Sequence, residues 1–270
     1  MTLPSRLART AGISLIAWLP VLTSGCIQNS GPDKRDIHSL ADLDAELSTR
    51  RSAVHDLLLA TTMKVEGLEH SGAVTAYINC EPPDRFRMDA TKRMGPTLFV
   101  FVMVKDRFVI NVAIEGKWVR GEVKSQMKEH QELVAAFAWI EERLEPGDDR
   151  SIAEDEEDHL TVVTKRGGKP VRSTRYDRAT LFASRIVFFG EDGAETASVA
   201  LSDYRAVKPA EARPGPSAWI PWRIAVTGKT KDGKEYRVDT SITRVDLNDG
   251  IKPEAWNMEI PEGAVVEQAK

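Results

Sequence analysis

The five histidines are the side chains of this protein best suited to bind a metal or move a proton, and their spacing favours neither. His38, His55, His70, His130 and His159 form no His-Glu-x-x-His or His-x-His pair. A zinc site needs several ligands at short and regular spacing. We therefore expect surface histidines and no metal site.

Serine and carboxylate chemistry is also weakly indicated. Ser198 and Ser217 lie outside any Gly-x-Ser-x-Gly turn, and no glycine pattern for a nucleotide follows a strand-like segment. The acidic run at 154–158 (EDEED) lacks the central glycine and distal glutamate of a calcium loop, so we interpret it as a solvated connection. The sequence predicts no enzyme and no cofactor.

One of the two cysteines ends a segment that is typical of exported proteins. Residues 1–10 carry Arg6 and Arg9, and residues 11–25 carry no charge, which is the order found in a signal peptide. The stretch LTSGC that ends at Cys26 resembles a bacterial lipobox, in which the cysteine becomes the acylated N-terminus. We predict a signal peptide over 1–25, lipidation of Cys26 and a flexible tether over 26–38. A plain cleavage site with an ordinary cysteine is the alternative.

Charge narrows the possible partners. The formal net charge is −4, whereas nucleic-acid binders usually present a basic surface, so we expect no nucleic-acid partner. An acidic chain is not attracted to anionic lipid, so acyl chains on Cys26 would have to hold it on a membrane. With Cys26 acylated, Cys80 has no partner for a disulfide within the chain, and the fold must depend on its core.

Apolar periodicity predicts two helices. Ser39 and Asp42 have the spacing of a capping box, and apolar residues recur at helical spacing from Leu40 to Leu58, which indicates a helix over 39–60. A second helix is predicted over 122–144, and Pro146 with Gly147 ends it.

Alternating patterns predict strands elsewhere. The segment 97–104 (TLFVFVMV) is apolar on both faces, so both faces must be covered or one must face an apolar cavity. Between Ile242 and Val245 the apolar phase slips by one residue, as a β-bulge requires. The expected strands are one that begins near Met63, 73–80, 85–90, 97–104, 108–114, one at Trp118, 159–166, 171–177, 181–190, 195–205, 219–228 and 234–245.

These elements predict an α+β fold that is mainly antiparallel β. Hairpin turns join successive strands, and no βαβ alternation is visible. We expect one domain over 39–270, an unclosed curved β-barrel of about ten or eleven strands with two helices that cover the concave side. Such a concave side tends to leave an apolar pocket, where ligands bind. The candidate lining residues are Phe99, Phe101, Met103, Phe108, Ile110, Phe137, Ile140, Phe188 and Trp222.

Three segments resemble the LolA/LolB-like superfamily of lipoprotein carriers. The C-terminal stretch 242–266 resembles its closing strand and tail, with Asn248, Trp256 and the Ile260-Pro261-x-Gly263 ending. The segment 83–88 (PDRFRM) resembles an early strand of the superfamily, and 176–193 resembles one of its hairpins. The resemblance implies an unclosed antiparallel barrel around helices, an apolar cavity for acyl chains, and no catalytic residues.

The two lines of reasoning predict a lipid-anchored protein of the cell envelope, on the outer membrane and facing the periplasm. It would bind or transfer a lipid or a lipoprotein acyl chain in its cavity. The alternative is a structural or assembly lipoprotein that uses the same fold without a ligand and binds an envelope protein partner through a sheet edge or a loop.

Overall fold

Fourteen strands form one continuous sheet in the described part of the chain. The computed structural model describes residues 37–68, 71–93, 95–122, 144, 146–230 and 232–268. The strands are β1 (Leu57–Glu66), β2 (Gly72–Glu81), β3 (Arg85–Lys92), β4 (Thr97–Val104), β5 (Arg107–Val112), β6 (Lys117–Glu122), β7 (Asp148–Asp155), β8 (His159–Arg166), β9 (Lys169–Asp177), β10 (Ala183–Phe189), β11 (Glu195–Val207), β12 (Ala218–Lys229), β13 (Glu235–Leu247) and β14 (Val266–Gln268).

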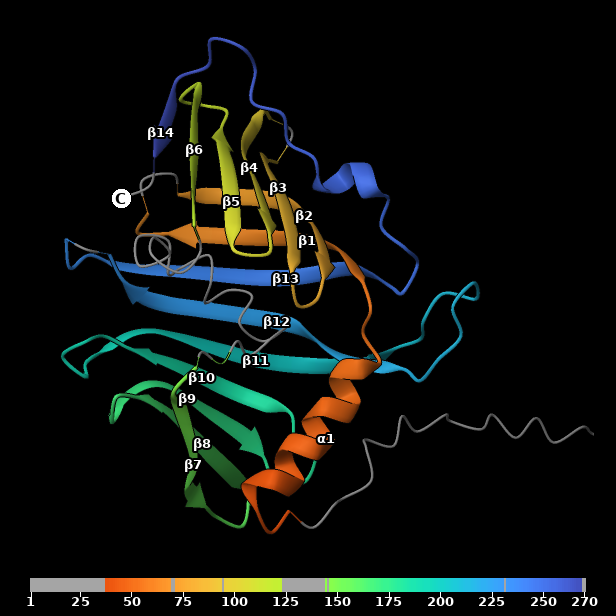
Figure 1. Ribbon diagram of the computed structural model, residues 1–270, viewed down its shortest axis with the longest axis vertical. Helices are drawn as coiled ribbons and strands as arrows, with labels where there is room; N and C mark the ends of the chain where they lie inside the picture. The colour runs from red at the N-terminus through yellow and green to blue at the C-terminus, as the bar shows by residue number, and fades with distance from the viewer. Residues whose placement is uncertain are drawn as a thin grey trace, which may run out of the picture. The chain divides into compact units, whose positions relative to one another are not determined.

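The order of the strands confirms an unclosed, mainly antiparallel sheet. The order is β14-β6-β5-β4-β3-β2-β1-β13-β12-β11-β10-β9-β8-β7, so β14 and β7 are the two edges. Only β14 pairs in parallel, with β6. In Figure 1, β1, β2, β12 and β13 run across the view while β4, β5 and β6 run along it, so the sheet is strongly curved.

The expected number of strands, ten or eleven, is wrong. The additional strands include β7, which contains the first two residues of the acidic run at 154–158 and pairs with β8. Its sequence, DDRSIAED, has little apolar character because β7 is an edge strand, and charged side chains protect such an edge from further pairing. The predicted solvated connection is therefore confined to the turn at 156–158.

The described residues contain one α-helix, α1 (Leu40–Ser52), which is shorter than the predicted helix over 39–60. The N-terminus is as predicted, since Ser39 Oγ accepts from the Asp42 N–H at 3.2 Å and donates to the Asp42 carboxylate at 2.8 Å. Residues 57–60 instead pair with β2 and β13, because sheet pairing on both sides outweighs their helical spacing. The second predicted helix, over 122–144, falls almost entirely on residues outside the described ones.

Asn248 fixes the corner where α1 gives way to β1. Its Oδ1 accepts from the backbone N–H groups of His55 and Asp56 at 2.8 and 3.2 Å. Its Nδ2 donates to Ala53 O at 2.9 Å. The carboxylate of Asp56 is buried and accepts from the Gly250 N–H at 3.0 Å and from Arg213 at 3.0 Å. These bonds tie the end of α1 to the end of β13.

Both faces of β4 are covered, as its apolar sequence requires. On one face Phe101 pairs with Met88 and Ile110 in the core. On the other, Val102 stands opposite Arg87 and is only 5% exposed. The 3-10 helix η2 (Pro253–Trp256) contacts β3 and β4 there, and Arg87 donates to Ala255 O at 3.0 Å. The C-terminal segment therefore seals the outer face of this part of the sheet.

The predicted β-bulge in β13 is confirmed. Ala60 pairs with Arg244 and Thr61 with Ile242, which leaves Thr243 as the extra residue. Ile242 and Leu247 are both buried although they are five positions apart, an odd spacing, because the bulge resets the alternation. The large core cluster therefore continues along the whole strand pair.

Buried apolar residues form two clusters. The larger one joins β1–β5 to β10–β13, and the smaller one packs α1 on β8 and β9 through Leu43, Leu160, Val162 and Tyr176. No helix among the described residues is both long enough and apolar enough to cross a membrane.

Candidate functional site

An apolar pocket of about 180 Å³ lies between α1 and the strands β9–β12. Figure 1 shows α1 lying beside these strands in the lower half of the view. The pocket is lined by Leu47, Arg50, Arg51, Val54, Leu57, Arg172, Thr174, Tyr176, Leu181, Phe182, Ala183, Ile186, Tyr204, Ser217, Ala218, Trp219, Ile220 and Pro221. Aliphatic and aromatic side chains predominate in this wall, which is the typical composition of a ligand pocket.

The helix that covers this pocket is held by contacts at both ends. Near its N-terminus Leu43 is fully buried against β8 and β9. Asp44 forms an ion pair with Arg150 of β7. Near the C-terminus Arg50 donates to Thr180 O at 2.8 Å. The middle of α1, with Leu47, therefore spans the pocket between two attachments.

The turn between β9 and β10 shapes the floor of the pocket. Asp177 Oδ1 accepts from the Thr180 N–H at 2.8 Å and from its hydroxyl at 2.7 Å. This local bonding directs the chain into a left-handed conformation at Leu181, with φ of 54°, and Leu181 is buried under α1. A side chain of this kind accepts the strain of positive φ only where burial compensates for it.

Three aromatic side chains form one wall. Phe182 stacks on Tyr204 with ring centroids 4.3 Å apart and lies 5.3 Å from the ring of Trp219. The Tyr204 hydroxyl donates to Ala183 O at 2.7 Å. Burial raises the pKa of Tyr204, so its hydroxyl remains a neutral donor at physiological pH. This wall is therefore mainly apolar, and the hydroxyl of Tyr204 has its partner within the fold.

The volume of the pocket limits what fits. An engineered apolar cavity of about 150 Å³ binds benzene, so 180 Å³ accommodates a ring or a short acyl segment. A longer chain requires α1 to move away from the sheet, or the chain to extend out of the pocket mouth.

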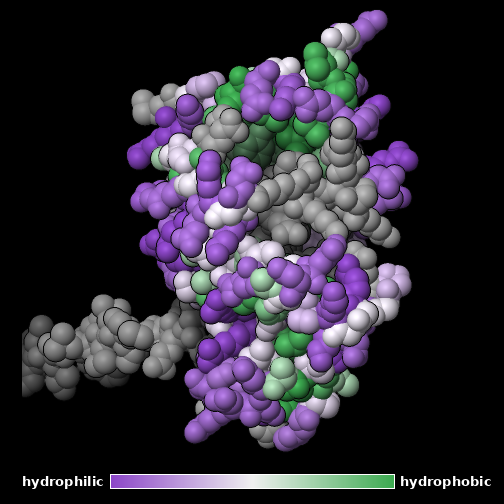
Figure 2. All heavy atoms as spheres, turned by 90° about the vertical axis from the view of Figure 1, so that its left-hand side faces the viewer, coloured by the Kyte–Doolittle hydropathy of each residue, from purple (hydrophilic) through white to green (hydrophobic). Residues whose placement is uncertain are grey.

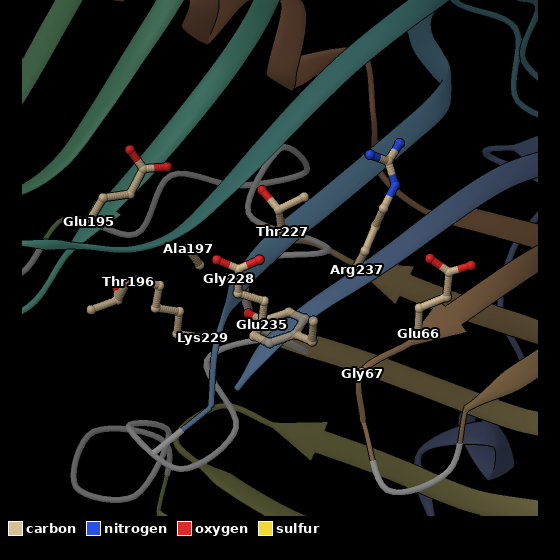
Figure 3. A pocket seen from close by; sticks show the side chains of 11 residues that line it. Glu66, Gly67, Glu195, Thr196, Ala197, Thr227, Gly228, Lys229, Glu235 and Arg237 are labelled. Atoms are coloured by element: carbon tan, nitrogen blue, oxygen red, sulfur yellow. The ribbon is translucent and has the colours of Figure 1, made fainter. Parts of the chain in front are cut away.

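A second hollow, of about 640 Å³, lies at the hairpin ends of β1, β11, β12 and β13 (Figure 3). Its lining is polar and includes Glu66, Glu195, Lys229, Glu235 and Arg237. Several of these charges are paired along their own strand, Glu66 with Lys64 and Arg237 with Asp239, and Arg237 lowers the pKa of the Asp239 carboxyl. This wall suits water better than an acyl chain.

Seven of the candidate lining residues predicted from sequence lie in the described part of the chain. All seven belong to the large core or pack against it. Phe101, Phe108 and Ile110 are buried members of the core. Phe99, Met103, Phe188 and Trp222 are partly buried and pack against it. Neither hollow is lined by any of these seven residues. Their predicted contact with a ligand stays a prediction.

Hydrophobic side chains are nonetheless accessible on the same part of the sheet. Figure 2 shows them gathered around a hollow in the upper half of the view, above a largely hydrophilic surface. The upper half of Figure 1 holds β1–β6 and β14. Phe137, Ile140 and Cys26 lie outside the described residues.

The histidines are not all on the surface as predicted. His38 and His55 are exposed, but His159 is only 9% exposed. Its Nδ1 lies 2.6 Å from Asp158 and 2.8 Å from the Arg175 guanidinium. Contact with His159 lowers the pKa of the Asp158 carboxyl.

One group of possible metal ligands surrounds this histidine. Glu156, Asp158 and His159 each offer an atom within 4.8 Å of the others. The guanidinium of Arg175 beside His159 disfavours a second cation there. We therefore assign this group a role in fixing the β7–β8 turn.

None of the described candidates predicted from sequence lines the pocket under α1. Trp219 and Pro221 were available as a signal, because they make the start of β12 apolar on both faces, as in β4. Such a strand needs cover on both sides, and α1 lies over this part of the sheet.

Comparison with known proteins now defines the class of fold. No family model matches the chain, and no curated protein matches it. Solved structures do match it. A putative outer membrane lipoprotein-sorting protein domain from Vibrio parahaemolyticus is 12% identical with a TM-score of 0.60, over 80% of this chain and 95% of that one. A DUF1329 family protein from Desulfovibrio piger is 9% identical with a TM-score of 0.57, over 80% and 95%.

A further match names the superfamily itself. A LolA superfamily protein from Nitrosomonas europaea is 9% identical with a TM-score of 0.54, over 82% of this chain and 99% of that one. The chain therefore has a fold like that of this LolA superfamily protein, as its sequence motifs predict.

Proposed function

We propose that this protein binds the acyl part of an amphiphile between α1 and the strands β9–β12, as a carrier or receptor rather than an enzyme. The observation that supports this most directly is the apolar pocket with the aromatic wall of Phe182, Tyr204 and Trp219. The LolA-like fold adds support, because one of its matched structures is described as a lipoprotein-sorting domain.

The driving force is the transfer of methylenes from water to this wall, at about 0.8 kcal/mol for each buried CH₂. Because the pocket holds only a short segment, a full chain either displaces α1 or extends out of the pocket mouth. In the first case the contacts of Leu43 and Arg50 with the sheet and the β9–β10 turn have to loosen.

The proposal includes the location of the protein. Acylation of Cys26 would anchor the chain in the cell envelope, on the outer membrane and facing the periplasm, and residues 27–38 would tether the domain. Replacing Cys26 with serine should then release the protein from membranes. A Cys26→Ser protein that stays membrane-bound and is processed as before would contradict the proposed lipid anchor. It would not contradict the proposed binding in the pocket.

The binding proposal is tested on residues 31–270, which form one compact unit holding every described residue. We expect native mass spectrometry and lipid extraction of this domain to find a co-purified amphiphile. Leu47→Glu puts a carboxylate at the pocket and should abolish binding. Ile114→Glu introduces the same charge at a site that is 40% exposed and should not.

Two results would contradict the proposal. One is a domain that carries no amphiphile and takes up none when it is offered. The other is equal binding by Leu47→Glu and Ile114→Glu. A stable envelope protein partner together with an empty domain would favour the structural role instead.

A further inference from the structure

The mouth of the pocket under α1 is positively charged. Arg50, Arg51 and Arg172 are among its lining residues, and none of the lining residues in the described part of the chain is an aspartate or a glutamate. The whole chain is acidic, with a formal net charge of −4. Glu46 pairs with Arg50, whereas Arg51 pairs with no carboxylate among the described residues, so Arg51 places a positive charge beside an otherwise apolar wall.

The arginines of α1 are held differently. Arg50 is bound on two sides, by Glu46 Oε1 at 3.0 Å and by Thr180 O at 2.8 Å, and its guanidinium lies 5.6 Å from the Phe182 ring. Arg51 is exposed, and its Nε donates to Leu47 O at 3.3 Å. Among the described residues no carboxylate forms an ion pair with Arg51.

Arg172 belongs to the sheet side of the same pocket. Its Nε donates to Thr174 Oγ1 at 3.1 Å, and its guanidinium lies 5.9 Å from the Phe188 ring. An apolar interior with a guanidinium rim matches a molecule with an apolar chain and an anionic end.

We propose that the ligand is a single-chain amphiphile with an anionic headgroup. Its chain lies against Phe182, Tyr204 and Trp219, and its anion lies at Arg51 within the positive mouth. This inference rests on the proposed function and adds the chemical class of the ligand. A single chain is favoured over two because the pocket measures about 180 Å³.

The test compares two probes of equal chain length and opposite charge. Laurate and dodecyltrimethylammonium are titrated into residues 31–270 below their micelle concentrations, by isothermal calorimetry. We expect laurate to bind at least about tenfold more tightly, with an advantage that shrinks at high ionic strength.

Variants of Arg51 test whether this residue causes the tighter binding of laurate. Arg51→Gln should weaken laurate binding about threefold, as expected for one partly exposed ion pair, and leave the cationic probe unchanged or tighter. Arg51→Lys should retain most of the affinity. Arg107→Gln, which removes the same charge from an exposed site on β5, should have no effect.

The outcomes separate this inference from the function on which it depends. Equal affinity for the two probes, or equal effects of Arg51→Gln and Arg107→Gln, overturns the headgroup assignment while the carrier function stands. If neither probe binds, both proposals fail.

Discussion

Asn248 should contribute strongly to the free energy of unfolding, because its side chain ties the segment between α1 and β1 to the end of β13. Its carboxamide forms three hydrogen bonds, to the N–H groups of His55 and Asp56 and to Ala53 O. Asn248 is only 3% exposed, and it has a left-handed backbone with φ of 57°. Removal of the carboxamide leaves these backbone groups unpaired in a region that water hardly reaches.

Two variants separate the contribution of the hydrogen bonds to stability from the contribution of the backbone conformation. Asn248→Gly keeps the left-handed conformation and loses the hydrogen bonds, at about 1 kcal/mol each, so we expect the free energy of unfolding to fall by about 3 kcal/mol. Asn248→Ala loses the same bonds but keeps a Cβ at positive φ, which glycine lacks, so it should be about 1 kcal/mol less stable than Asn248→Gly.

Urea unfolding of residues 31–270, followed by circular dichroism, measures these differences. Asn257→Ala is the control, because Asn257 is exposed and should change stability by less than about 0.5 kcal/mol. The reasoning is refuted if Asn248→Gly is as stable as the control, or if Asn248→Ala is no less stable than Asn248→Gly.

Three further changes test the packing and the helix cap. A Cβ at Gly228 would lie 2.6 Å from Tyr236 Oη and 2.8 Å from Thr196 O, so Gly228→Ala should lower the free energy of unfolding by about 1–3 kcal/mol in a urea titration. Trp256→Ala uncovers the outer face of β4 and should cost about 3 kcal/mol or more in the same assay; a loss below 1 kcal/mol would mean that η2 is not the cover. Ser39→Ala removes the cap of α1 and should cost about 1 kcal/mol. The Ser39 hydroxyl also lowers the pKa of the Asp42 carboxyl, so the stability from this bond is present at neutral pH and lost as the pH falls through the folded-state pKa. Urea titrations between about pH 5 and pH 2 should therefore show a smaller acid-induced loss in Ser39→Ala than in the parent, and equal losses would contradict the assignment.

Strands could be predicted from sequence wherever one face of the sheet is exposed to solvent and the other is buried. β3 alternates Arg85, Arg87 and Asp89 with apolar residues, and the phase slip in β13 marked the bulge at Thr243 correctly. These patterns depend only on the two-residue period of a strand.

Prediction failed where distant contacts decide the local structure. The Leu-rich start of β1 has a helical spacing, but it pairs with β2 and β13, and Asn248 binds the N–H groups just before it. β7 has almost no apolar pattern because it is an edge. Neither long-range fact is visible in a window of neighbouring residues.

The candidate site also combines features that local sequence patterns indicate with features that only distant contacts decide. The aromatic residues of β4 and β5 were expected among the lining residues of one pocket. Phe101 does lie 6.0 Å from Phe108, but neither residue lines a described pocket. The pocket under α1 depends on which strands the helix crosses, and the sequence of α1 does not determine this. Leu47, Phe182 and Trp219 come together only through the fold.

Site-resolved labelling tests the central claim most directly. A fatty acid that carries a diazirine on its chain is bound to residues 31–270 and photolysed, and the labelled residues are identified by mass spectrometry of peptides. We predict labels at Leu47 of α1, at Phe182 in the turn before β10 and at Trp219 of β12. Labels confined to the hairpin-end hollow around Glu66 and Glu235, or to the face of β4 that carries Phe101, would contradict binding beneath α1.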